Sequence, residues 1–126
     1  MSRSLKNKIT DKELVIPYLY NLFYKCGIKK NFNIDKIYLV GSRGRNSVED
    51  WDKSFIKYKD WDLLIQTNRK IKHPNLWIDN KYHIEIIICD TEDKVTMIRG
   101  NNRGGSGLGF ELFPNTPEEL KIYIIK

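Results

Sequence analysis

Alanine is absent from this chain, and cysteine, methionine and histidine occur only twice each among its 126 residues. The two cysteines, Cys26 and Cys89, lie 63 positions apart, a spacing that matches no common metal site or redox motif. Such sparse use of cysteine is typical of a reducing compartment, so we expect a cytoplasmic location.

Long apolar runs are missing as well. The longest stretches of consecutive aliphatic residues have three members, as at Ile86–Ile88, whereas a membrane helix needs about 20 apolar residues. The first eight residues are polar and basic and lack the apolar segment of a signal peptide. We therefore expect no membrane association and no cleaved signal sequence.

Large apolar side chains are nevertheless abundant. Leucine, isoleucine, valine and phenylalanine together number 37, which is enough for one hydrophobic core and too many for a disordered chain. The length suits a single domain that spans 1–126.

Positive charge is concentrated near the start of the chain. The net charge is +6, and residues 1–45 carry ten Lys and Arg against three Asp and Glu. A basic segment can meet a polyanion such as a nucleotide phosphate or a nucleic acid. The 16 lysines, 17 isoleucines and 11 asparagines also indicate an AT-rich gene, so part of the lysine content reflects codon usage.

The order of apolar patterns predicts an α+β domain. A capping box at Thr10 and Glu13 and a helical stripe of apolar residues predict a first helix that ends near Gly27. Loops with a turn or two of helix are expected at 42–59, a glycine-rich loop at 99–109 and a helical turn at 116–119. Strands are expected at 36–40, 61–67, 76–78, 82–89, 110–113 and 122–125.

Two carboxylates stand at the start of an apolar strand. Asp60 and Asp62 flank Trp61, and positions i and i+2 of a strand point to the same face. Two like charges on one face of a sheet repel each other. A divalent cation between them removes this cost, and hard oxygen ligands suit Mg²⁺ or Mn²⁺.

A third carboxylate, Glu85, lies between Ile84 and Ile86 in the most apolar strand. A lone carboxylate in such surroundings costs several kcal/mol unless it is paired or metal-bound. Two carboxylates on one strand and one on its neighbour could hold two metal ions about 3.5 to 4 Å apart, the arrangement used for phosphoryl transfer.

The segment Gly41–Ser42–Arg43–Gly44–Arg45 directly follows the strand at 36–40. A strand that ends in Gly-Ser lets the backbone approach a phosphate, to which the serine hydroxyl and the arginines can donate. The segment is not a P-loop, because no Gly-Lys-Ser/Thr follows at the required spacing.

In this order, strand–Gly41–Ser42, Asp60–Trp61–Asp62–Leu63 and Ile84–Glu85–Ile86 resemble the nucleotidyltransferase superfamily typified by DNA polymerase beta. The glycine- and arginine-containing string looks most like the minimal nucleotidyltransferases of bacteria and archaea. The resemblance covers residues 36–89 and implies a mixed β-sheet with helices packed on one face. It places the catalytic core at about 36–90, followed by the glycine-rich loop and short strands of 99–126.

The resemblance also implies roles for seven residues. Asp60, Asp62 and Glu85 would bind two Mg²⁺ or Mn²⁺ ions, and Glu85 would help to ionise the attacking hydroxyl. The remaining four would bind the nucleotide phosphates, namely Gly41, Ser42, Arg43 and Arg45. The reaction would transfer a nucleoside monophosphate from an NTP to a hydroxyl of a protein, a nucleic-acid end or a small molecule, with release of pyrophosphate.

Several alternatives stay open at this point. Asp50–Trp51–Asp52 repeats the acidic triplet, but it runs into Lys53 rather than into an apolar strand, so we favour the second triplet. Trp51 and Tyr58 are candidates for stacking on a base, whereas Trp61 is expected in the core. The chain could instead be a non-catalytic nucleic-acid-binding module, or a regulatory, antitoxin-like subunit that is completed by a protein partner.

Overall fold

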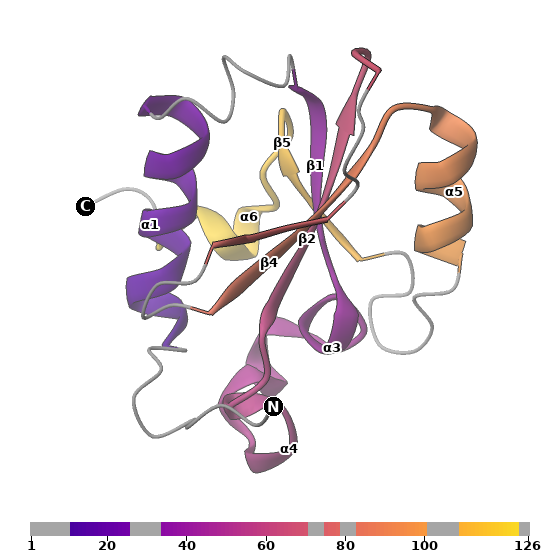
Figure 1. Cartoon of the computed structure of the whole chain (residues 1–126). Coiled ribbons are helices and arrows are strands. Elements are labelled where there is room, and N and C mark those ends of the chain that lie inside the picture. Colours follow the sequence, from indigo (N-terminus) through magenta and orange to yellow (C-terminus); the bar gives the residue numbers. More distant parts are fainter. Residues whose placement is uncertain (1–10, 26–33, 71–74, 79–82, 101–108, 124–126) are drawn as a thin grey trace.

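The computed structural model describes residues 11–25, 34–70, 75–78, 83–100 and 109–123, and Figure 1 shows their arrangement. The strands are β1 (Ile34–Val40), β2 (Trp61–Thr67), β3 (Asn75–Ile78), β4 (Ile84–Cys89) and β5 (Phe110–Phe113). The helices are α1 (Lys12–Lys25), α3 (Gly41–Gly44), α4 (Ser54–Lys57), α5 (Glu92–Gly100) and α6 (Glu118–Lys121), with a 3₁₀ helix, η2, at Val48–Asp52.

The five strands form one sheet in the order β3-β4-β2-β1-β5. Strands β2 and β4 run parallel, and the other neighbouring pairs run antiparallel. The sheet is therefore mixed, and the expected α+β class is confirmed. The strand expected at 61–67 has the predicted bounds, and the one expected at 76–78 lies within β3, which pairs with β4.

Helices cover both faces of this sheet, so the expectation of helices on one face is wrong. Figure 1 shows α1 and α5 on opposite sides of the strands. Trp61, Leu63 and Ile65 of β2 belong to the core that α1 and α6 cover, on what we call the α1 face. Leu64 belongs to a second cluster with Val95 of α5, on the α5 face. The reason is that β2 is apolar on both faces and must be covered on both.

Helix α5 is not among the elements expected from the sequence. Its start is capped by Thr91, whose hydroxyl accepts a hydrogen bond from the Lys94 amide at 3.2 Å. Acidic residues in the first turn and a basic one in the last complement the helix dipole. The helix was missed because it buries few apolar side chains, so its periodicity is weak.

The ends of some helices and strands also differ from those expected from the sequence. Helix α1 is capped by Asp11, whose carboxylate accepts the Glu13 amide at 2.8 Å, whereas Thr10 of the expected capping box lies outside the described residues. Residues 122 and 123 form a turn rather than the start of a strand, and 124–126 are not described. Most of the glycine-rich loop, 101–108, is likewise outside the described residues. None of the helices in the described ranges is both long and apolar enough to cross a membrane.

Candidate functional site

Gly41 occupies the point where β1 ends and α3 begins. Its φ is +73°, in the left-handed region that favours glycine. A Cβ atom added to it would collide with Oδ2 of Asp62 and would lie 3.1 Å from that residue's Cβ and Cγ. The backbone of the Gly-Ser segment therefore lies directly against the carboxylate of the second acidic triplet, which no side chain at position 41 would permit.

Asp62 and Glu85 lie side by side on two parallel strands. They are direct register partners of β2 and β4, and both are half-buried. Both lie on the α5 face, because they alternate with residues of the α1 face along their strands. The sequence-based prediction that these strands bring the two carboxylates together is consistent with this register.

The electrostatics of the pair reflect its burial. Desolvation raises the pKa of Asp62 to about 7, with further contributions from the negative charges of Glu85 and Asp60 and from a hydrogen bond with Glu85. The positive charge of Arg45 opposes this shift. At neutral pH the Asp62 carboxyl therefore holds a proton for part of the time, as expected of a half-buried acid beside other negative charges.

Asp60 is placed differently from its neighbour. It precedes β2, and its Oδ1 contacts Nδ1 of His83, which precedes β4 at the matching position. His83 is buried and has a positive φ of 54°, which is uncommon for a residue other than glycine. The structure thus places Asp60 near enough to raise the pKa of Asp62, while its carboxylate is engaged by His83.

Arg43 does not face the site, which contradicts the phosphate-binding role expected for it. Its side chain is only 1% exposed, and its Cζ lies 4.0 Å from the centre of the Trp61 ring. Nη2 donates hydrogen bonds to the backbone oxygens of Lys57 at 3.3 Å and Lys59 at 3.1 Å. The two aromatic neighbours, Trp61 and Trp51, make this a favourable site for a planar cation.

Arg45 is the arginine of the Gly-Ser segment that reaches the carboxylates. It is half-buried, lines the same cavity as Asp62 and Glu85, and donates from Nη2 to the Ser42 hydroxyl at 3.5 Å. Ser42 and Arg45 are therefore the members of this segment that can supply a hydroxyl and a positive charge to an anionic ligand.

Arg45 and the two carboxylates line an open cavity of about 200 Å³. Gly41, Arg45, Asp62 and Glu85 make its polar part. Its apolar wall consists of Val40 from β1, Ile87 from β4 and Ile98 from α5. Sequence reasoning missed Ile98, because only the packing of α5 on the sheet brings it here.

The donor set fits a hard divalent cation. Asp62 is half-buried and is made harder to ionise by the charge of Glu85 beside it, so a cation between the two carboxylates would relieve this cost. Within the described ranges, no group of three or more His, Cys, Asp or Glu side chains is arranged to hold one metal ion. Asp62 and Glu85 are therefore the residues that would hold a first cation, and Asp60 would join them only on release from His83.

The remaining expectations have mixed outcomes. The two aspartates of the first acidic triplet lie at the surface, where Asp50 pairs with Lys53 and Asp52 pairs with Lys12, each at 2.7 Å. Trp51 is wrong as a base-stacking residue, because it is 1% exposed and donates from Nε1 to the Arg43 carbonyl oxygen at 2.9 Å. Trp61 is fully buried, so its expected place in the core is confirmed.

The site thus collects parts of the chain that lie far apart in sequence: the end of β1, the start of β2, the start of β4 and one side chain of α5. This combination offers paired carboxylates, one arginine and an apolar wall, and the Ser42 hydroxyl accepts a hydrogen bond from that arginine. Comparison of the chain with protein-family models, with characterised proteins and with solved structures gave no significant match.

Proposed function

We propose that this protein is a metal-dependent nucleotidyltransferase, which transfers a nucleoside monophosphate from an NTP to a hydroxyl acceptor. One observation carries the proposal. Gly41, Asp62 and Glu85 come from the three separate segments of the family-like pattern, and all three line one cavity. The close fit of Gly41 against Asp62 gives a physical reason for glycine at that place.

The phosphates of the nucleotide would lie between the carboxylate pair and Arg45. A divalent cation on Asp62 and Glu85 would supply positive charge to the triphosphate, as hard cations do in phosphoryl-transfer sites. Arg45 and the Ser42 hydroxyl would donate to phosphate oxygens beside it. The open cavity suits a ligand that extends beyond the pocket, since its volume alone is smaller than that of common ligand sites.

The chemistry requires positioning and removal of one proton. The acceptor oxygen forms a bond to the α-phosphorus, and the bond between that phosphorus and the oxygen that leads to the β-phosphorus breaks. Pyrophosphate leaves with the electron pair. The hydroxyl proton passes to the Asp62–Glu85 carboxylate pair and then to solvent, since a carboxylate near the reacting oxygen is a suitable general base.

The proposal is tested by incubating the protein with each α-labelled NTP and Mg²⁺ or Mn²⁺, alone and with candidate acceptors, and measuring pyrophosphate release and label transfer. We expect turnover by the parent and loss of about 100-fold or more for Asp62→Asn and Glu85→Gln. Asp52→Asn, in the exposed first triplet, is the matched control and should retain near-parental activity. Transfer at a parental rate by the Glu85→Gln and Asp62→Asn proteins would overturn the proposal.

A further inference from the structure

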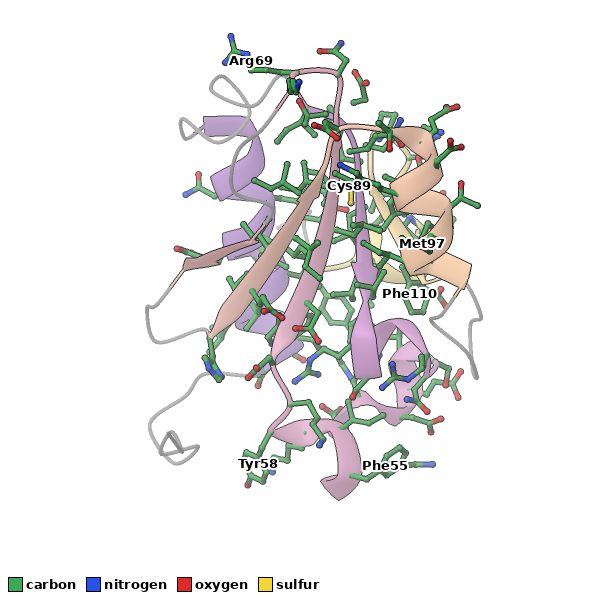
Figure 2. All side chains as sticks on the ribbon, turned by 45° about the vertical axis from the view of Figure 1, so that its right-hand side comes forward. Phe55, Tyr58, Arg69, Cys89, Met97 and Phe110 are labelled. Atoms are coloured by element: carbon green, nitrogen blue, oxygen red, sulfur yellow. The ribbon has the colours of Figure 1, made fainter. Side chains whose placement is uncertain are left out.

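The turn around α4 carries a basic and aromatic surface next to the candidate site. Ile56 is fully buried and anchors the turn, whereas Phe55 is 57% and Tyr58 46% exposed. Figure 2 shows Phe55 and Tyr58 at the end of the molecule formed by α4, projecting away from the sheet. Together with the exposed Lys53, Lys57 and Lys59, these two residues form what we call the α4 surface.

The charges of this surface are only partly compensated. Lys53 pairs with Asp50 at 2.7 Å. Lys57 and Lys59 form no ion pair with another residue in the described ranges, and the Lys57 ammonium lies 5.5 Å from the centre of the Tyr58 ring. Exposed rings beside unneutralised lysines are complementary to a ligand with planar bases and phosphates.

The α4 surface is also held in a defined position relative to the carboxylates. Arg43, which belongs to α3, binds the backbone oxygens of Lys57 and Lys59. Helices α3 and α4 lie at the same end of the sheet in Figure 1, where β1 ends and β2 begins. Asp62 lies four positions after Tyr58, which limits the distance between their Cα atoms to about 14 Å, the length of roughly four stacked nucleotides.

We propose that the α4 surface binds single-stranded nucleic acid and directs its 3′-hydroxyl towards Asp62 and Glu85. Single strands are favoured because their bases can unstack and pack on Phe55 and Tyr58, which bases inside a duplex cannot do. The identity of the acceptor rests on the proposed function, whereas the binding does not. In the reaction, the 3′-oxygen bonds to the α-phosphorus of the NTP, and pyrophosphate leaves as the bond between the α-phosphorus and its bridging oxygen breaks.

Binding is tested first, without metal or NTP, by fluorescence anisotropy with a labelled single-stranded oligonucleotide of about 12 nucleotides. Phe55→Ala and Tyr58→Ala should each weaken binding about 5- to 100-fold, since each removes one stacking ring. Lys57→Gln and Lys59→Gln should each lower the slope of log K against log salt by about 0.7. Met97→Ala is the matched control, because Met97 is an exposed apolar residue of α5, 62% exposed, outside this surface.

Three results would overturn the binding proposal: no affinity for the oligonucleotide, equal affinity for a duplex of the same length, or undiminished binding by a Phe55→Ala/Tyr58→Ala double variant. If the α4 surface instead binds a partner protein, the oligonucleotide should show no affinity. All substituted side chains are exposed, so circular dichroism should report a parental fold.

The acceptor role is tested with oligonucleotides that end in a 3′-hydroxyl or a 3′-deoxy group, with labelled NTP and Mn²⁺ or Mg²⁺. We expect extension of the oligonucleotide that ends in a 3′-hydroxyl and no extension of the one that ends in a 3′-deoxy group. Pyrophosphate release without extension would remove the acceptor role but leave the proposed function. Oligonucleotide binding with no release from any NTP would remove the proposed function but leave the binding surface.

Discussion

Gly41 shows how much one residue can determine at this site. Its positive φ and its contact with Asp62 are separate constraints, and each excludes a larger side chain. The first concerns the backbone, because residues with a Cβ rarely adopt this conformation. The second concerns space, because the colliding atoms belong to a half-buried carboxylate whose neighbours limit its movement.

Gly41→Ala should therefore lower the free energy of unfolding by about 1 to 3 kcal/mol and should abolish nucleotidyl transfer, since Asp62 must move. Gly100→Ala is the control. A Cβ there meets nothing within 4 Å, and the position is the last of α5, so stability should be unchanged or slightly higher. Urea unfolding of both variants measures the difference, and equal midpoints for the two would contradict the argument.

Among the elements, the side chain of Arg43 connects two short helices, neither of which would hold its position without tertiary contacts. Helices α3 and α4 have four residues each, too short to be stable without tertiary contacts. The Arg43 side chain spans them, stacked on Trp61 and hydrogen-bonded to the carbonyl oxygen of Lys57 at the end of α4. Burial lowers the pKa of Arg43 to about 10, so the guanidinium stays charged at neutral pH.

Replacing this side chain should loosen the segment between α3 and β2. Arg43→Met should cost about 2 to 3 kcal/mol of unfolding free energy, because the stacked, hydrogen-bonded guanidinium is lost. Arg43→Lys should recover little of it, since an ammonium cannot bind both carbonyl oxygens and stack on the ring. Arg45→Lys, at the half-buried arginine two positions on, should unfold at nearly the parental urea concentration. A fully stable Arg43→Lys protein would show that charge alone holds the two helices.

At the scale of the whole molecule, the sheet divides into a well-covered face and one that is hollowed beside its covering helix. Val95 of α5 packs on the α5 face, and the cavity with Asp62 and Glu85 opens on the same face beside Ile98. The carboxylates are thereby desolvated without being enclosed. The burial that prepares these carboxylates to bind a cation therefore lowers the stability of the metal-free fold, a trade-off that is common at functional sites.

This opposition predicts how the stability of the metal-free protein depends on pH. Asp62 has a pKa of about 7 in the folded chain, above its ordinary value of 3.8, so the folded state binds the proton more tightly. Ionisation of Asp62 therefore lowers the free energy of unfolding. This loss is absent below pH 4, grows as the pH rises to about 7, and reaches up to about 4 kcal/mol above that.

Urea unfolding at pH 5 and pH 8 measures this contribution in the parent and in Asp62→Asn. The parent should lose more stability than the variant between the two pH values, and Mg²⁺ or Mn²⁺ at pH 8 should restore stability to the parent alone. If the variant were less stable than the parent at pH 8, Asp62 would be a structural residue rather than a strained one.

Local sequence patterns were enough to locate the strands that carry the site and the order of their functional residues. Strand β2 has its predicted bounds, and Trp61 is buried as expected, because local apolar runs and alternation depend only on neighbouring residues. The proximity of Asp62 and Glu85 could also be anticipated, since each lies near the start of a strongly apolar strand.

Which charged groups face the cavity depends on contacts that exist only in the folded chain. Arg43 and Arg45 are indistinguishable in the sequence, yet one is buried under Trp61 and the other lines the site with Glu85. Asp60 is engaged by His83 because the parallel register of β2 and β4 brings together the residues that precede both strands. These outcomes depend on contacts between distant segments, and a local pattern carries no information about the partner that a side chain will meet.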